Sequence, residues 1–453
     1  METTEMFYKI LRFCGVLMLA TTATAQAAPP NIVFIMVDDL GWADVAFNDH
    51  KGNAPTPNLK QLAAKSLELT QHYVAPVCSP TRTALLTGRC WSRFGITSPT
   101  NTLAIPTDTV TLSRALKSQG YETCLTGKWH LGSLPKWGPN HFGFDHSYGS
   151  LAGGITSFAH RYKKGPYTNT WHRNETLIEE DGHVTDLLTN EAISWIARNS
   201  ERGNKPFFLY VPFTAVHLPI NETKDWVDKI PALITKPIAR QYAACIMHMD
   251  HSVGRILKAL DEHGLRQNTL IVFTSDNGGS WSENKDLKYP LDDSITGRLT
   301  GNNKPLRDQK GSIYEGGTRV PTLVSWPGKI ETGKNATPVF IADWMPTFCN
   351  LAGFPTDREL AWDGTDLSGL ITTGTKIAER PIYIAGPNWR ACSLRVGDWK
   401  LVESNNKQRY ELYNIAEDPS EKTNLAATHL QRVTSMMVTL EEVRAADNDS
   451  VVK

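Results

Sequence analysis

One stretch of the chain decides the fold class: Asn31-Ile32-Val33-Phe34-Ile35-Met36-Val37, which runs directly into Asp38-Asp39. A continuous apolar run of this length is typical of a strand that is buried on both faces, at the centre of a parallel sheet. Similar runs occupy residues 207–211 and 270–274, and helical patterns occupy 184–199 and 238–263. Because strands and helices alternate, the sequence predicts an α/β body with a mostly parallel sheet.

Shorter helices and strands are predicted between these long elements. Thr56 and Pro57 are typical of a helix start, with an N-cap followed by proline at the first position. A second helix is predicted over residues 111–119, ended by Gly120, and a strand over 121–126.

The pattern changes after about residue 376. Four short apolar runs follow closely on one another and predict a small antiparallel sheet, on which a last helix over about 425–444 should pack. We therefore divide the chain into a body at 28–375 and a C-terminal subdomain at 376–453. The four runs are residues 381–384, 393–396, 399–402 and 410–413.

Composition narrows the class of protein. The chain has 453 residues, of which 40% are hydrophobic and 21% are charged, as in ordinary globular proteins. Lys and Arg number 47, and Asp and Glu also number 47. A formal net charge of zero argues against a chain built to bind nucleic acid.

Residues 1–27 have the pattern of a secretory signal peptide. Lys9 and Arg12 precede a short apolar run, and Ala25-Gln26-Ala27 is an A-x-A cleavage site. The alternative is a membrane anchor, but this run and every later one falls short of the roughly 18 apolar residues that a span needs. The sequence therefore predicts an exported chain, periplasmic or secreted, without a stable membrane anchor.

Two polar clusters follow predicted strands, Asp38-Asp39 and Asp276-Asn277. In an open α/β sheet, sites assemble at the carboxyl ends of the strands. Three carboxylates and one amide oxygen form a hard, all-oxygen set that suits Ca²⁺ or Mg²⁺ better than Zn²⁺. The alternative is that these residues only form turns and cap the next element.

A third segment favours the metal site: Val77-Cys78-Ser79-Pro80-Thr81-Arg82, followed closely by Leu86-Thr87-Gly88-Arg89. The pattern Cys-x-Pro-x-Arg followed by Leu-Thr-Gly-Arg resembles the maturation signature of the type I sulfatases. In that family a maturation enzyme, either the formylglycine-generating enzyme or the anaerobic sulfatase-maturating enzyme, oxidises the cysteine to formylglycine (3-oxoalanine). The alternatives for Cys78 are a small buried hydrophobe or half of a disulfide.

The resemblance extends over nearly the whole chain after residue 27. Asn302 to Arg307 is similar to the branch that contains arylsulfatases, N-acetylgalactosamine-4-sulfatase and many bacterial polysaccharide sulfatases. The other matching segments, in chain order, are 37–42, 127–132, 275–278, 310–317 and 412–426.

This resemblance implies an alkaline-phosphatase-like fold and a set of roles. Lys128, His217 and Lys310 would hold the sulfate, with Lys304 as a nearby alternative to Lys310. Arg82 would stabilise the hydrated aldehyde, and His130 would be hydrogen-bonded to it. The residues implied to bind one Ca²⁺, together with an oxygen on modified Cys78, are Asp38, Asp39, Asp276 and Asn277.

The family's chemistry explains the modification. One hydroxyl of the hydrated aldehyde attacks sulfur and expels the sugar alcohol, and the second then loses its proton so that sulfate leaves. Asp276 is the candidate base, and His217 or Lys310 would protonate the leaving oxygen. The implied function is hydrolysis of sulfate esters of a sulfated carbohydrate. The alternatives are a phosphate or phosphonate ester hydrolase of the same superfamily, or a non-catalytic glycan-binding relic.

The substrate is less well defined. Residues 160–164 and 171–173 are basic and aromatic, and 388–390 read Asn-Trp-Arg. Each could contact a polyanionic glycan, because aromatic rings stack on sugars and Arg pairs with sulfate; each could equally be a solvated loop. Six cysteines follow the signal peptide and could form up to three disulfides, but the role proposed for Cys78 leaves at least one unpaired.

Overall fold

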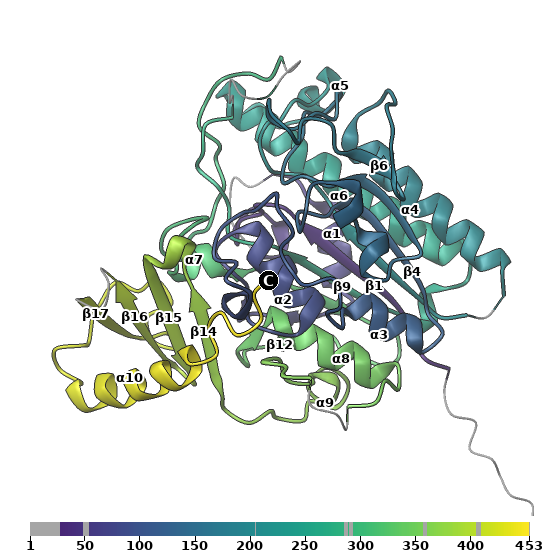
Figure 1. Cartoon of the computed structure of the whole chain (residues 1–453). Coiled ribbons are helices and arrows are strands. Elements are labelled where there is room, and N and C mark those ends of the chain that lie inside the picture. The colour runs from purple at the N-terminus through teal and green to yellow at the C-terminus, as the bar shows by residue number, and fades with distance from the viewer. Residues whose placement is uncertain are drawn as a thin grey trace, which may run out of the picture.

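The computed structural model describes residues 28–48, 54–203, 205–284, 289, 293–356, 360–404 and 409–452. The predicted signal peptide at 1–27 lies outside these residues. A ten-stranded sheet crosses the molecule, and a four-stranded sheet lies at one side of it (Figure 1). Within the described part of the chain, no helix is long and apolar enough to cross a membrane.

The large sheet is parallel at its centre and mixed at its edges. Its central five strands, in the order β9-β1-β8-β4-β5, are all parallel to their neighbours. The edge strands β11 and β6 run antiparallel to β9 and β5. The strands in sheet order are β12 (Gly333–Asn335), β2 (Leu67–Leu69), β11 (Leu323–Ser325), β9 (Thr269–Ser275), β1 (Asn31–Val37), β8 (Phe207–Pro212), β4 (Glu122–Lys128), β5 (His146–Ser150), β6 (Trp171–Arg173) and β7 (Thr176–Leu177).

The predicted central strand divides two hydrophobic cores. Because side chains alternate along a strand, Ile32, Phe34 and Met36 enter one core. Val33, Ile35 and Val37 enter the other. Every residue of β1 is buried, which confirms the sequence interpretation.

Helices cover both faces of the sheet (Figure 1). On one face α6 packs against α4 and α1, and on the other α2, α3 and α8 pack against one another. The helices are α1 (Pro57–Ala63), α2 (Cys78–Thr87), α3 (Leu112–Ser118), α4 (Val184–Glu201), α5 (Lys224–Asp228), α6 (Pro237–Glu262), α7 (Glu315–Thr318), α8 (Trp344–Leu351), α9 (Ser368–Thr373) and α10 (Leu430–Arg444).

The C-terminal sheet is antiparallel, as predicted. Its strands, in order, are β14 (Pro381–Ala385), β15 (Ala391–Val396), β16 (Trp399–Ser404) and β17 (Arg409–Asn414). Its apolar side chains, with those of α10, belong to the same core as Phe34. The boundary expected at residue 375 falls between α9 and β14. A small third sheet joins β10 (Arg319–Val320), β3 (His72–Tyr73) and β13 (Val339–Phe340).

Three local predictions are corrected. The last helix begins at Leu430 rather than near 425, because Thr428 and His429 both donate to the Leu425 carbonyl in a turn. Thr56 precedes α1 but does not cap it, since its hydroxyl accepts from Ala46 N instead. The six described cysteines are all buried and form no disulfide with one another, so the bridges considered above are not present. They pack as small hydrophobes in separate elements, such as β4 for Cys124 and α8 for Cys349.

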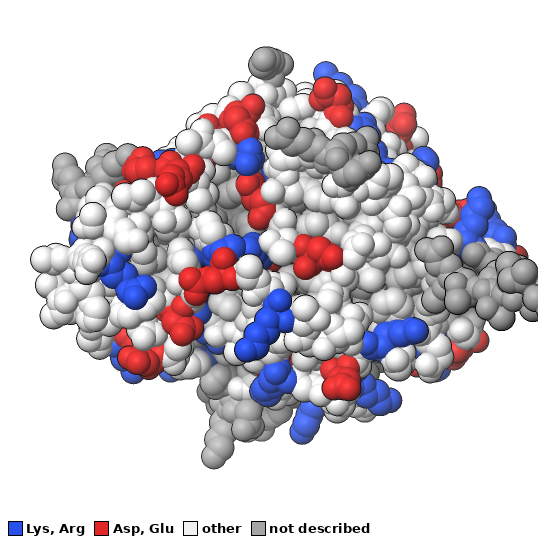
Figure 2. All heavy atoms as spheres, turned by 90° about the horizontal axis from the view of Figure 1, so that it is seen from below, with Lys and Arg blue, Asp and Glu red and all other residues white. Residues whose placement is uncertain are grey.

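Positive and negative side chains alternate over the face seen in Figure 2. No single continuous basic surface covers it, in keeping with the balanced charge of the chain.

Candidate active site

The two polar clusters meet at one edge of the sheet. Asp38 and Asp39 directly follow β1, and Asp276 and Asn277 directly follow β9, its parallel neighbour. Lys128 ends β4 on the other side of β8. Parallel neighbours end at the same edge, so the alternation of strand and helix brings these residues together.

Cys78 is the first residue of α2 and is 1% exposed. Its Sγ, one carboxylate oxygen each of Asp38 and Asp39, and one ring nitrogen of His217 all lie within 4.8 Å of one another. The positive end of a wholly buried helix therefore points at the carboxylates.

Two oxygens at this site have no hydrogen-bond partner in the described structure, Asp38 Oδ1 and Asn277 Oδ1. The amide nitrogen of Asn277 donates to Asp39 Oδ1 at 2.8 Å, which fixes the direction of its oxygen. Asp276 differs, because its Oδ2 pairs with Arg82 at 2.7 Å and its Oδ1 accepts from Asp39 N at 3.2 Å. Both oxygens of Asp276 are thus engaged by the chain itself.

The lysines and histidines surround the same point. The Nζ of Lys128 contacts Asp38 at 2.5 Å, and that of Lys310 contacts Asp39 at 2.6 Å. Nε2 of His217 lies 4.0 Å from Asp39 Oδ2. His130 is buried, with an unpartnered Nδ1. Of the two alternatives Lys304 and Lys310, Lys310 lies at this site and Lys304 is exposed.

The carboxylates have opposite electrostatic surroundings. Burial, together with the negative charges of Asp276 and Asp39, raises the pKa of Asp38 well above its usual range. Burial would also raise the pKa of Asp39, but Lys310 and His217 outweigh it and the pKa falls. Such crowding of negative charge is relieved by a cation.

The thiol and the imidazoles are uncharged. Burial raises the pKa of Cys78 to about 12, although Lys128 and Lys310 oppose the shift. Burial, reinforced by nearby lysines, holds the pKa values of His130 and His217 well below the usual value for histidine. A protonated thiol is a poor nucleophile, so Cys78 as a plain cysteine is unsuited to attack.

Comparison with known proteins gives this geometry its context. The sulfatase family matches residues 30–354. The chain belongs to the sulfatase family. A second family, described as N-sulphoglucosamine sulphohydrolase, C-terminal, matches residues 308–446 of this sulfatase.

Relatives of this sulfatase include arylsulfatase J of Mus musculus, 31% identical over 84% of this chain and 65% of the relative. This chain therefore spans just under two thirds of that protein. N-acetylgalactosamine-6-sulfatase of Mus musculus is 31% identical over 91% of this chain and 80% of the relative.

The structure of Ps i-CgsB in complex with k-i-k-neocarrahexaose is 32% identical, with a TM-score of 0.82 over 93% of this chain and 94% of that one. By family, the chain is a sulfuric ester hydrolase with the alkaline-phosphatase-like fold inferred from its motifs.

The sequence interpretation missed several residues that build the site of this sulfatase. Ser79 Oγ donates to the His130 carbonyl at 2.9 Å, and Thr81 Oγ1 donates to that of Asp276 at 2.6 Å. A Cβ at Gly153 would lie 2.3 Å from the His130 ring, and one at Gly154 would lie 2.9 Å from the His217 ring. In the sequence, the adjacent glycines Gly153 and Gly154 could have indicated this close packing, because any larger residue would clash there.

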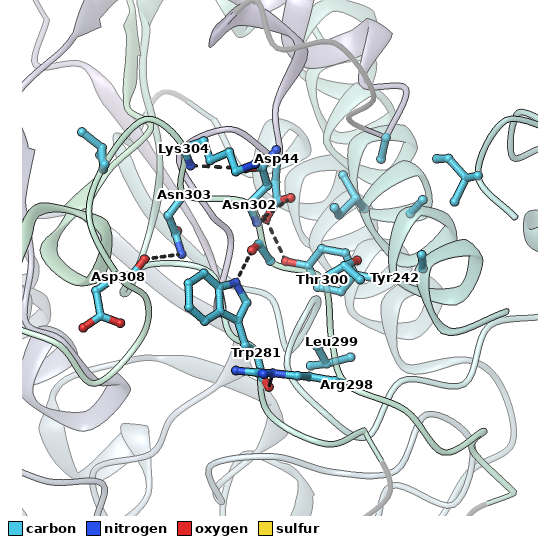
Figure 3. A pocket seen from close by; sticks show the side chains of 17 residues that line it. Asp44, Tyr242, Trp281, Arg298, Leu299, Thr300, Asn302, Asn303, Lys304 and Asp308 are labelled. Atoms are coloured by element: carbon cyan, nitrogen blue, oxygen red, sulfur yellow. Dashed lines mark hydrogen bonds between the residues drawn. The ribbon is translucent and has the colours of Figure 1, made fainter. Parts of the chain in front are cut away.

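A cavity of about 730 Å³ lies beside the turn that follows Asn277. Trp281 stands in its wall, where its indole nitrogen donates to Gly301 O at 2.7 Å (Figure 3). The guanidinium of Arg298 lies 5.6 Å from the Trp281 ring, and Lys304 also lines the cavity. The backbone of Trp281 is tied to Gln309, next to Lys310, by a 2.6 Å hydrogen bond.

The basic and aromatic stretches are largely neutralised within the chain. His160 is buried and stacks on Trp171 at 4.5 Å, and Arg161 pairs with Glu179. Arg173 pairs with Glu191. These contacts give 160–164 and 171–173 partners within the chain, and 171–173 form strand β6 rather than the solvated loop considered as the alternative. Trp389 remains 41% exposed.

Proposed function

We propose that this chain is an exported sulfatase that hydrolyses sulfate esters of a sulfated carbohydrate and releases inorganic sulfate. In this proposal, formylglycine formed from Cys78 is the nucleophile and one Ca²⁺ is bound beside it. The observation that carries the proposal is the position of Cys78, within 4.8 Å of two carboxylates and His217 at the buried start of α2.

The donor set fits a hard cation. Asp38 and Asn277 each present an unpartnered buried oxygen, and burial, together with the neighbouring carboxylates, raises the pKa of Asp38. These oxygens suit Ca²⁺, with Asp38, Asp39, Asn277 and residue 78 as its ligands, and Asp276 as a further ligand if it leaves Arg82. When bound, Ca²⁺ would polarise the sulfate and orient the nucleophile.

Residue 78 fits the modification. The buried thiol stays protonated, whereas a hydrated aldehyde supplies one hydroxyl to attack sulfur and a second that permits release of sulfate. A maturation enzyme must act first. Because Cys78 is buried in the folded chain, we expect maturation to precede folding.

The chain's own cations surround the place where the sulfate would lie. We assign Lys128 and Lys310 to bind its oxygens, where fixed positive charge stabilises the charge that develops at sulfur. We assign protonation of the leaving sugar oxygen to Lys310 Nζ or, once that imidazole has taken up a proton, to His217 Nε2. Arg82 Nε is unpartnered and would stabilise the hydroxyls on residue 78, beside His130.

A carbohydrate is the proposed substrate class because of the relatives and the neighbouring cavity. One relative is an N-acetylgalactosamine-6-sulfatase, and one similar structure holds k-i-k-neocarrahexaose. In the cavity, Trp281 offers a ring for a sugar face, and Arg298 and Lys304 offer cations for a second sulfate.

The remaining parts of the proposal concern processing. We propose that residues 1–27 are a signal peptide, that 28–375 form the catalytic domain and that 376–453 form a C-terminal subdomain. The mature protein would be periplasmic or secreted.

The deciding experiment is mass spectrometry of the tryptic peptide 66–82 from protein made with a maturation enzyme. We expect loss of one sulfur and two hydrogens and gain of one oxygen at residue 78, followed by Ca²⁺-dependent sulfate release from sulfated oligosaccharides. An unchanged thiol would contradict the formylglycine proposal. Release of phosphate, but not of sulfate, by matured protein would support the phosphoesterase alternative.

A further inference from the structure

A second group of metal-ligating side chains lies behind the loop that carries His217. His183 precedes α4, Asp186 lies in the first turn of α4, and His248 lies in the middle of α6. Glu222 belongs to the loop between β8 and α5, five residues after His217. The group forms where α4 and α6 pack side by side (Figure 1).

The polar atoms of this group are arranged in two sets. On the outer side, His183 Nδ1 contacts Thr185 N at 3.3 Å, and His248 Nδ1 contacts Glu222 Oε2 at 3.1 Å. On the inner side, His183 Nε2, His248 Nε2 and Glu222 Oε1 are buried and have no hydrogen bond in the described structure. A buried polar atom without a hydrogen bond is unfavourable, so three of them close together favour an occupant.

One inner distance is close to that between two ligands of a tetrahedral ion, and the other ligand atoms lie near enough to share an ion. His248 Nε2 is 3.3 Å from Asp186 Oδ1, and His183 Nε2 is 3.6 Å from Glu222 Oε1. Ligands at about 2.1 Å from a tetrahedral Zn²⁺ lie about 3.4 Å apart. One ligand atom each of His183, Asp186 and His248 falls within 4.8 Å of the others. A cavity of about 10 Å³, the size of one water, borders His183 and Glu222.

We propose that His183, Asp186 and His248 bind a divalent transition-metal ion, with Zn²⁺ as the ion that best fits two imidazoles and carboxylates. Glu222 Oε2 accepts from His248 Nδ1 and so turns Nε2 toward the ion, an arrangement common around zinc. Glu222 Oε1 lies 3.6 Å from His183 Nε2 but is not one of the ligand atoms within 4.8 Å of one another, so water would complete the coordination. To bind the ion through Nε2, His183 must carry its proton on Nδ1. The 3.3 Å contact in which Nδ1 accepts from Thr185 N is then lost.

The competing interpretation is a network held together by a proton. Asp186 and Glu222 outweigh burial and raise the pKa of His248 to about 9, so an imidazolium could hold the two carboxylates. That arrangement accounts for His248, but His183 Nε2 and Glu222 Oε1 stay without a hydrogen bond. A metal ion bound by the group would use both His183 Nε2 and His248 Nε2.

The position suggests what the ion would do. Trp226 stacks on His248 at 4.6 Å and covers it, while the half-exposed Asp186 leaves a path for the ion. Bound there, the ion would join α4, α6 and the loop of residues 213–223. It would thereby brace the backbone that carries His217, without contact with the substrate.

The test is zinc binding by purified protein that has been stripped of metal and then saturated with Ca²⁺. We expect elemental analysis to find one tightly held Zn²⁺ per chain and thermal unfolding to shift upward. Co²⁺ at the same site should give the visible absorption of tetrahedral coordination. Failure to bind Zn²⁺, or binding without any thermal shift, would overturn the proposal.

Variants locate the ion independently of sulfatase activity. His248→Gln and Asp186→Asn should each lose Zn²⁺ and the cobalt spectrum, and the half-exposed position of Asp186 keeps the second variant folded. His251→Gln, on the same helix but outside the group, and Asp38→Asn at the active site should keep both. Loss of zinc in Asp38→Asn instead would assign the ion to the active site.

Discussion

The carboxylates at the active site and the carboxylate of Glu315 differ in how completely the chain pairs them. Glu315 is buried, its Oε1 contacts Lys400 at 2.9 Å and its Oε2 accepts from Tyr73 at 2.7 Å. At the active site Lys128 and Lys310 also contact buried carboxylates. There, however, Asp38 and Asn277 each keep an oxygen with no partner.

This difference separates two uses of buried charge. Glu315 joins the body to the C-terminal sheet through Lys400 on β16, and Arg395 on β15 lies 4.0 Å away. Lys400, Arg395 and Arg319 outweigh burial and lower the pKa of Glu315 to about 2. At Glu315 the chain pairs both carboxylate oxygens, whereas at the active site the open oxygens of Asp38 and Asn277 are the atoms proposed to bind the metal ion.

The largest expected effect is at the active site, the open cluster in which Asp38 and Asn277 keep unpartnered oxygens. Cys78→Ala removes the residue that becomes the nucleophile, and we expect kcat/KM for a sulfated sugar to fall on the order of 10⁶-fold, as when other enzymes lose a nucleophile. Thermal unfolding should change little, and sulfate release by ion chromatography measures the loss. Cys124→Ala, a buried cysteine in β4, is the matched control. Comparable loss in both variants would contradict the assignment.

The paired cluster, which consists of Glu315, Lys400 and Glu421, should show the reverse pattern, a loss of stability without a loss of activity. Lys400→Met leaves Glu315 and Glu421 without their ammonium group, and we expect the free energy of unfolding in urea to fall by about 3–5 kcal/mol. Activity per folded molecule should be largely kept. Lys334→Met breaks an exposed pair with Glu68 and should cost at most about 1 kcal/mol. Equal losses would mean that burial does not distinguish the two pairs.

Removing one open oxygen tests the metal assignment directly. Asn277→Ala deletes an unpartnered oxygen, and we expect the Ca²⁺ concentration for half-maximal activity to rise about 100-fold, because calcium affinity follows the ligand set. Calcium titration after chelation measures it. Asn190→Ala, on the exposed face of α4, should leave the titration unchanged. An unaltered midpoint in Asn277→Ala would remove that residue from the metal site.

Glu421 provides a pH test of the paired cluster. Burial and Glu315 outweigh Lys400 and raise the pKa of Glu421 to about 7. The folded state therefore keeps a proton that the unfolded chain releases near its ordinary pKa of about 4.5. Stability from this group is full at low pH and is lost as pH rises toward about 7.

Glu421→Gln should flatten this dependence by about 1–2 kcal/mol, as measured by urea unfolding at about pH 5 and about pH 8. Identical slopes for the variant and the parent protein would assign the pH dependence to other groups.

The smallest expected effect is on the binding of sugar units beyond the one that carries the reacting sulfate. Trp281→Ala should raise KM for a sulfated oligosaccharide about 10-fold, the worth of one stacking contact, and leave a small aryl sulfate unaffected. Trp389→Ala tests the exposed indole in the turn between β14 and β15 of the C-terminal subdomain. If Trp389→Ala raises KM and Trp281→Ala does not, the oligosaccharide binds at the C-terminal subdomain instead.

Much of the fold follows from local pattern. Three of the five central strands, β1, β8 and β9, are short apolar runs, as expected for strands covered on both faces. The other two, β4 and β5, are more polar, and the sequence pattern did not predict β5. The cysteine motif and its companions likewise identified the family from contiguous residues. The start of α10 was placed too early, since the turn at Leu425 depends on carbonyl geometry rather than on apolar periodicity.

The sequence by itself determined the α/β class, the C-terminal sheet and the residues to examine, because those depend on neighbours along the chain. Only the tertiary structure decided that Arg82 engages Asp276 while Asn277 keeps an open oxygen. It also brought His183 to His248, 65 residues apart in the sequence. Which polar atoms find partners is set by packing between distant elements, and no local pattern encodes it.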